Sequence, residues 1–227
     1  HGLLRLVDRP RWETVVGGSD RYVRRLVDRA EARFLTGCRV EGVRRSGDGV
    51  EIGLADGRSG SFDRAVVATH ADQALELLRD PSEGERETLS AWTYTSSDTW
   101  LHSDRSFLPD RRPAWCSWNY RLRDCRARDD RPRVTYYLNR LQRIDGERPY
   151  LVTLNPSRPP APESVLDRTT FLHPAYGPGA EGAQSRLREL SGRGRVHFCG
   201  AHVGYGFHED AVRSAVRAAD ELGATLP

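Results

Sequence analysis

The stretch VHFCGAHVGYGFHEDAVRSA, residues 196–215, decides which fold the chain is expected to adopt. It predicts a short strand over 196–199 that meets Gly200, a loop rich in glycine and aromatic residues over 201–208, and an amphipathic helix over 209–222. Glycine at a strand end lets the backbone approach a bulky ligand, and free N–H groups of the loop can face negative charge. The stretch fits a site for an anionic or electron-accepting ligand, although glycines that only turn the chain explain the spacing equally well.

A glycine pair near the beginning of the chain has a similar setting. Thr14–Val16 is a short apolar run that meets Gly17 and Gly18, and Ser19 then stands where the N-cap of a helix is expected. Apolar residues at helical spacing follow between Tyr22 and Ala30. This segment therefore predicts a strand or loop, a tight glycine turn and an amphipathic helix.

Three strand-like runs follow, over 38–44, 50–55 and 61–69, and turn sequences rich in glycine and aspartate separate them. Alternating segments with such turns predict a β-meander. The third run contains the uninterrupted apolar residues 65–68, which indicate a strand buried on both faces. A short helix is expected over 71–78.

The character of the sequence changes at Trp92. Four segments rich in aromatic and β-branched residues follow, over 94–102, 114–122, 134–141 and 150–154, and residues 156–162 then form a stiff proline-rich linker. We therefore expect residues 92–164 to form an inserted antiparallel-sheet domain that binds substrate, and residues 1–91 and 165–227 to form the other domain. Within the latter, a strand is expected to end near residue 174 and a helix to cover 180–190.

The composition limits the functions of the chain. All 35 basic residues are arginine, which excludes Schiff-base chemistry within these residues, and the net charge of only +3 argues against a nucleic-acid surface. The four cysteines lack the spacing of metal ligands, so we expect no metal site and reduced thiols in a cytoplasmic protein. The sequence starts at His1 and contains no methionine, so we expect further residues to precede it.

The 196–215 stretch resembles the C-terminal flavin motif of the superfamily that contains amine oxidases, protoporphyrinogen oxidases and phytoene desaturases, in the version of a bacterial subgroup of NAD/FAD-binding oxidoreductases. The glycine pair at 17–18 is similar to the superfamily's turn that faces substrate and flavin, and residues 67–70 resemble its third FAD contact region. The resemblance implies a mixed α/β and α+β fold, in which a partial Rossmann-like FAD-binding domain of the glutathione-reductase type carries the β-meander. The FAD-site residues it implies are Gly17, Gly18, Ser19, Val40, Ala68, Thr69, Gly200, Ala201, Gly204, Tyr205, Gly206, Phe207, His208, Glu209, Asp210 and Ala211.

The chain departs from the superfamily pattern in two places and lacks one of its motifs. Ala201 stands where the family has an acidic residue, and the Ser-Gly of the last helix is Ser214-Ala215 here. No GxGxxG turn between a strand and a helix, the usual binding element for the dinucleotide, occurs in the 227 residues. We therefore expect the chain to be the C-terminal part of a longer enzyme and to be inactive alone.

The resemblance also implies roles for individual side chains. The helix that begins near Glu209 would direct its positive N-terminal dipole at the flavin. His208 would carry protons, or would be an ordinary neighbour of the helix cap. Trp115, Trp118 and Tyr120, with Asn119 beside them, would line a substrate cavity, or would be plain core residues.

The function implied is an FAD-dependent oxidoreductase that oxidises or desaturates a small apolar, lipid-like substrate. The alternative is a non-catalytic protein that keeps the flavoprotein fold to bind a lipid or a partner. Peripheral contact with a membrane stays open, and the sequence predicts no oligomeric state. The three flavin segments serve one cofactor only if they converge, so Gly200 is expected near residues 17–18 and 68–69.

Overall fold

The computed structural model describes residues 7–8, 13–122 and 133–224. The chain divides into two compact units. The sheet unit consists of His1–Phe34 and Ser96–Phe171, and the meander unit consists of Leu35–Thr95 and Leu172–Pro227. The first 34 residues thus group with the expected substrate domain and not with residues 35–91, and the functional assignment of the units stays a prediction.

The meander unit contains the expected three-stranded antiparallel sheet. Strand β1 (Val40–Ser46) pairs with β2 (Gly49–Leu54), and β2 pairs with β3 (Ser59–Phe62). Gly47 and Gly57 stand in the two connections with φ angles of +53° and +83°. These left-handed conformations are the ones that tight hairpin turns require, so the turn signals in the sequence were sufficient to predict the meander.

A second sheet of the meander unit pairs β4 (Ala65–Val67) with β10 (Val196–Phe198) in parallel. The prediction of one strand over 61–69 is wrong, because β3 and β4 belong to different sheets. The prediction of burial on both faces is also wrong, since Val66 is 43% exposed. Successive side chains alternate along a strand, so Ala65 and Val67 face the core together while Val66 points away from it.

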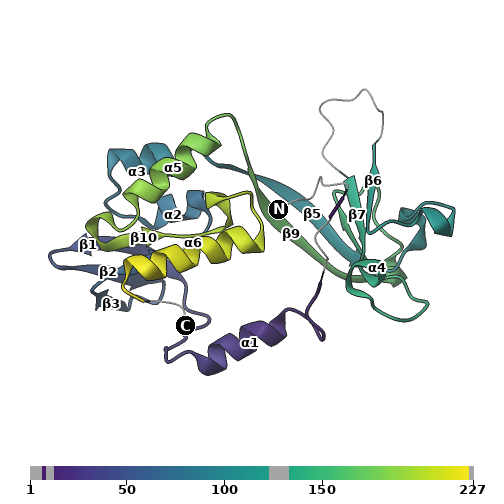
Figure 1. Cartoon of the computed structure of the whole chain (residues 1–227), viewed down its shortest axis with the longest axis horizontal. Coiled ribbons are helices and arrows are strands. Elements are labelled where there is room, and N and C mark those ends of the chain that lie inside the picture. Colours follow the sequence, from purple (N-terminus) through teal and green to yellow (C-terminus); the bar gives the residue numbers. More distant parts are fainter. Residues whose placement is uncertain (1–6, 9–12, 123–132, 225–227) are drawn as a thin grey trace. The chain divides into compact units, whose positions relative to one another are not determined.

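Helices complete the core of the meander unit. The core residues Leu89 of α3, Leu187 of α5 and Val196 of β10 are almost wholly buried. Both α5 and α6 contact β10, and α3 packs on α5 (Figure 1). The described α-helices of this unit are α2 (Ala71–Leu77), α3 (Glu83–Leu89), α5 (Ala180–Leu190) and α6 (His208–Glu221).

Helix α3 is absent from the sequence-based expectations. Its N-terminus is a capping box in which Glu85 N donates to Ser82 Oγ at 3.2 Å and Ser82 N donates to Glu85 Oε2 at 2.8 Å. The pattern of serine followed three residues later by glutamate is a recognised helix start. The signal was therefore present in the sequence.

The sheet unit is built on a five-stranded sheet with the order β6-β7-β8-β5-β9. The pairs β6–β7, β7–β8 and β8–β5 are antiparallel, which agrees with the antiparallel sheet expected here. The strand β9 was expected only near its end. The bounds of the strands are β5 (Thr93–His102), β6 (Trp118–Arg121), β7 (Arg133–Tyr137), β8 (Leu151–Leu154) and β9 (Val165–Ala175).

Two expected strands are shorter than predicted. The run over 134–141 ends as a helix, α4 (Leu138–Gln142), because Asn139 closes the connection to β8. Its Nδ2 donates to Arg148 O at 2.9 Å and its Oδ1 accepts from Tyr150 N at 2.7 Å. The run over 114–122 keeps only β6. Single-turn 3-10 helices are η1 (Arg105–Phe107), η2 (Arg112–Ala114), η3 (Pro162–Ser164), η4 (Arg193–Arg195) and η5 (Ala201–Val203).

The predicted helix after the glycine pair is α1 (Asp20–Arg29) of the sheet unit. Ser19 precedes it but makes no side-chain capping bond. The apolar residues Tyr22, Val23, Leu26 and Val27 are 41–65% exposed. Among the described residues, no helix has the length and apolar character needed to cross a membrane.

Candidate functional site

Glycines fix the shape of the loop after β10. Gly200 has φ +154° and ψ +167°, a conformation that is essentially restricted to glycine, and a Cβ atom there would lie 2.7 Å from Cε1 of His202. Gly206 has φ +87°, and its Cβ would lie 2.9 Å from the hydroxyl oxygen of Tyr176. The protein itself therefore requires both glycines. This agrees with the alternative in which the glycines turn the chain, and it does not exclude the approach of a cofactor to Gly200.

Two of the three predicted flavin segments meet in the meander unit. Cys199 N donates to Val67 O at 3.1 Å, and Thr69 O would lie 3.6 Å from a Cβ atom on Gly200. The segments that follow β4 and β10 therefore lie side by side. Gly200 lies near Thr69, as the sequence predicted. The glycine pair at 17–18 belongs to the sheet unit, and its approach to Gly200 stays a prediction.

Helix α6 is attached to β10 at two points. In the middle of the helix, Ser214 Oγ accepts a hydrogen bond from Gly200 N at 2.9 Å. Near its end, Glu221 Oε2 lies 2.8 Å from Nδ1 of the buried His197. These two contacts hold the middle of α6 against Gly200 and its end against β10.

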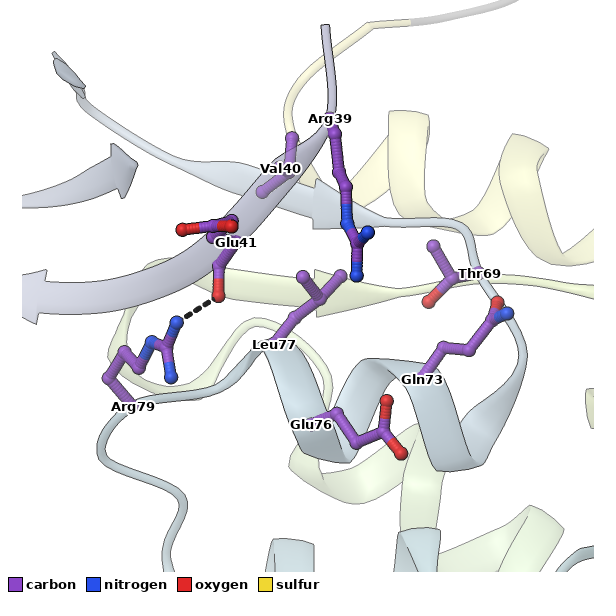
Figure 2. Close-up of a pocket in the computed structure, with 8 residues that line it drawn as sticks. All are labelled: Arg39, Val40, Glu41, Thr69, Gln73, Glu76, Leu77 and Arg79. Carbon is purple, nitrogen blue, oxygen red and sulfur yellow. Dashed lines mark hydrogen bonds between the residues drawn. The ribbon is translucent and has the colours of Figure 1, made fainter. Parts of the chain in front are cut away.

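A hollow of about 630 Å³ opens beside Thr69 (Figure 2). The start of β1 and one side of α2 form its walls, and the Arg79 guanidinium donates a hydrogen bond to the carbonyl oxygen of Glu41 there. Val40 and Thr69, both predicted FAD contacts, line this one hollow. Its lining consists of Arg39, Val40, Glu41, Thr69, Gln73, Glu76, Leu77 and Arg79.

Other predicted residues line two further hollows. In the sheet unit, Gly17 and Gly18 line one of about 660 Å³ together with Val15, Val16 and residues 141–144. In the meander unit, a hollow of about 700 Å³ is lined by residues of α5, the loop and α6, including Gly204, Tyr205 and Asp210.

Imidazole and aromatic rings pack next to the loop. His202 makes an edge contact with Trp92 at 5.1 Å between ring centroids, and His70 stacks on Tyr94 at 4.4 Å. The Tyr94 hydroxyl accepts from Ala71 N at 2.8 Å. Burial lowers the pKa of His202 to about 4, and the neighbouring His70 acts in the same direction. His202 is therefore neutral at physiological pH and fills space rather than carrying charge.

The predicted substrate-facing residues do not line any of the three hollows. Trp115 is held in place by neighbouring residues, because its Nε1 donates to Pro109 O at 2.8 Å and its ring makes an edge contact with Tyr137. Trp118 and Tyr120 on β6 are 49% and 61% exposed. A substrate role for these three residues stays a prediction.

At the start of α6, the predicted residues form an ordinary helix N-terminus. His208 is the first residue of the helix and is exposed. Asp210 Oδ2 accepts from Phe207 N at 3.0 Å, and Glu209 forms an exposed ion pair with Arg213 at 2.8 Å. Ala201 and Ala211 are partly buried. The catalytic role of His208 stays a prediction.

Two side chains of α5 contact the loop and are missing from the predicted site. Gln184 Nε2 donates to His202 O at 3.1 Å and to Gly204 O at 2.6 Å, and Arg188 Nη2 donates to Val203 O at 3.2 Å. Helical spacing places the residues on one side of α5. The sequence does not indicate which segment that side contacts, so it gave no signal for their role.

Strand ends that meet at a glycine-rich loop, with a hollow beside them and a helix held in place behind the loop, are what a cofactor-binding α/β protein of the flavoprotein kind requires. A family model for flavin containing amine oxidoreductases matches residues 2–223 of the chain. The chain belongs to this family. The match confirms the expected superfamily and FAD as its cofactor.

Solved structures with this fold are distant in sequence. A candidate protoporphyrinogen oxidase from Exiguobacterium sp. 255-15 matches with a TM-score of 0.65 at 14% identity, over 92% of this chain and 51% of that one. A fatty acid isomerase from P. acnes, which produces CLA, matches with a TM-score of 0.63 at 13% identity, over 91% and 51%. A putrescine oxidase variant matches with a TM-score of 0.61 at 12% identity, over 92% and 53%. The chain therefore spans about half the length of these structures, and no curated protein matches it.

Proposed function

We propose that the chain forms part of an FAD-dependent oxidoreductase that oxidises or desaturates a small apolar substrate. The observation that carries this proposal is the meeting of Gly200 and Thr69 at the ends of two parallel strands, beside the hollow that Val40 lines. Because Gly200 has no side chain, backbone atoms there can approach a bulky cofactor closely. The hollow would hold the adenosine end of FAD, and the loop after Gly200 would contact the flavin end.

The residues around the loop would bind and orient the cofactor. When bound, FAD supplies an acceptor for a hydride. Helix α6 has 14 residues, and the positive end of its dipole favours the negative charge that a flavin gains on reduction. His202 is neutral, so its imidazole adds no positive charge to the loop. His208, exposed at the helix start, would exchange protons with solvent.

We also propose that a dinucleotide-binding glycine turn outside these residues completes the FAD site. Among the described strands, β4 pairs with β10 alone, so its second edge has no partner strand. Val67 O bonds to β10, and the backbone groups of Val66 therefore point to that second edge. Parallel sheets are normally larger and covered on both faces, so an added parallel strand fits this edge. The matched length of about half of the solved structures supports the same proposal.

The apolar substrate is supported by the hollow of the sheet unit. Val15, Val16, Leu141 and Ile144 line it beside the glycine pair, with Glu13 and Arg143 as the charged lining residues. The lining holds one acidic and one basic residue, so its charges do not match the two positive charges of a diamine. It therefore favours an apolar molecule. The matched fatty acid isomerase is consistent with a lipid-like substrate.

The alternative function is non-catalytic binding of a lipid or a partner by the same fold. It is favoured by Ala201, which stands where the family has an acidic residue. The experiment that separates the two is purification of the protein with its upstream coding sequence, followed by measurement of visible flavin absorbance. Bound flavin that is bleached by an apolar substrate under anaerobic conditions and recovers with an electron acceptor supports the enzyme. A colourless protein that takes up no added FAD contradicts it.

A further inference from the structure

The carbonyl groups of the loop after β10 are all occupied over five consecutive residues. Gly200 O accepts from Val203 N at 3.2 Å, and Ala201 O accepts from Gly204 N and Gly206 N at 3.1 Å each. The next three carbonyls, those of residues 202–204, receive their hydrogen bonds from side chains of α5. The carbonyls of this segment that accept no hydrogen bond from the loop itself thus accept one from a side chain of α5.

Gln184 makes two of these three bonds. Its amide nitrogen lies 3.1 Å from His202 O and 2.6 Å from Gly204 O. Both partners are acceptors, so the nitrogen and not the oxygen of the side-chain amide must face them, and both of its hydrogens are used. Gln184 also lines the hollow formed by α5, the loop and α6, but only its Oε1 is left to contact a ligand there.

A carbonyl oxygen carries partial negative charge and would oppose the charge that accumulates on a flavin during reduction. A loop that serves such a cofactor must therefore direct its carbonyls elsewhere. Short loops rich in glycine do not do so by themselves, because glycine leaves the peptide planes free to rotate. A donor from a second element is needed to hold them.

We propose that Gln184 is a positioning residue for the cofactor loop: it holds the carbonyls of His202 and Gly204 on α5 and so keeps both oxygens away from the flavin. Arg188 does the same for Val203. The inference rests on the proposed FAD function, and it assigns to α5 a role in setting flavin affinity without contact with the flavin.

The test compares Gln184→Leu, which has a similar size and no donor, with Arg186→Gln on the exposed side of the same helix. Arg186 forms a surface ion pair with Glu87 at 3.5 Å. Two quantities are measured on the full protein: amide hydrogen exchange over residues 200–207, and the dissociation constant of FAD from a fluorescence titration. Gln184→Leu is expected to speed up exchange in the loop and to weaken FAD binding about tenfold, the equivalent of one to two hydrogen bonds. Arg186→Gln is expected to change neither.

Unchanged exchange over residues 200–207 in Gln184→Leu would overturn the inference. Faster exchange with unaltered FAD affinity would also overturn it, because a purely structural role of Gln184 gives this result. The midpoint reduction potential provides a second check. Gln184→Glu, which adds negative charge at the same place, should lower the potential more than Gln184→Leu does, and equal potentials would contradict the inference. If the wild-type protein binds no FAD, the proposed function is contradicted. The exchange measurement does not depend on FAD binding, so it tests the contact of Gln184 with the loop separately.

Discussion

The backbone of Gly200 lies at φ +154° and ψ +167°, and the ring of His202 fills the space in which a Cβ atom would stand. Each condition alone disfavours a side chain, and backbone strain of this kind costs about 1–3 kcal/mol. We expect Gly200→Ala to lower the free energy of unfolding by about that amount. Adding His202→Ala should recover only the part that is due to the ring contact.

Urea unfolding of both single variants and of the double variant measures this coupling. Strict additivity would show that the ring does not hinder a side chain at residue 200. A larger side chain at residue 200 would disturb the loop even if no cofactor bound there. Loss of flavin from such a variant would therefore not by itself show where the cofactor binds.

His102 of the sheet unit is fully buried and held in its neutral form. Asp104 N donates to Nδ1 at 3.1 Å, so Nε2 carries the hydrogen and donates to Thr153 Oγ1 at 2.8 Å. Thr153 in turn is hydrogen-bonded to Thr135 at 2.9 Å. Burial lowers the pKa of His102 from 6.5 to about 4.

The lowered pKa of His102 makes stability depend on pH in a defined direction. Between pH 6.5 and about 4 the unfolded state binds a proton that the folded state excludes. Stability that is present above pH 6.5 is therefore lost as the pH falls towards 4, by up to about 3 kcal/mol. His102→Gln keeps a donor and an acceptor but does not titrate, so its unfolding free energy should fall less steeply in this range. Identical pH profiles for both proteins would contradict the assignment, since His202 contributes equally to each.

At the scale of elements, the attachment of α6 determines the geometry of the loop. Ser214 Oγ accepts from Gly200 N at 2.9 Å and donates to Ala211 O at 2.7 Å, so it joins the helix to the strand end. We expect Ser214→Ala to lower the free energy of unfolding by about 1–3 kcal/mol, because the partly buried Gly200 N–H loses its acceptor. Thermal and urea unfolding measure the loss, with the exposed Ser185→Ala on α5 as the control. Equal stability of the two variants would show that water replaces the serine.

The elements that the sequence predicted best are those whose signals are local. The turn glycines at 47 and 57 defined the meander, and helical spacing gave α5 with the same bounds as in the structure. Failures occurred where a distant partner decides the outcome. Residues 61–69 split because β4 pairs with β10, which lies far along the chain, and the 134–141 run turns into α4 because Asn139 bonds to residues near β8.

The same distinction applies to the site. Gly200, Val40 and Thr69 are proposed FAD contacts that could be selected from the sequence, because their motifs resemble those of a family in which these segments contact FAD. Gln184 and Arg188 could not, because a polar residue on the surface of a helix looks the same whether it faces solvent or a loop. Their role depends on the packing of α5 against the loop, which only the structure provides.

At the scale of the whole molecule, the predicted FAD contacts are distributed unevenly between the units. Val40, residues 68–69 and residues 200–211 belong to the meander unit, and only residues 17–19 belong to the sheet unit. A ligand that binds only the folded state stabilises it by about 2.7 kcal/mol at a concentration one hundred times its dissociation constant. If the site is placed correctly, most of this stabilisation acts on the meander unit.

Amide hydrogen exchange with FAD and with FMN, which lacks the adenosine end, can test this placement. We expect FAD to slow exchange at residues 39–41 and 69–79 around the hollow, at the loop over 200–211, and at residues 17–19. FMN should protect the loop but not the hollow, because the hollow beside Thr69 is assigned to adenosine. Protection by FAD confined to β6, β7 and β8 of the sheet unit would show that the cofactor binds elsewhere. Equal protection of the hollow by both ligands would show that the hollow does not distinguish adenosine, and the orientation of FAD along β1 and α2 would then be wrong.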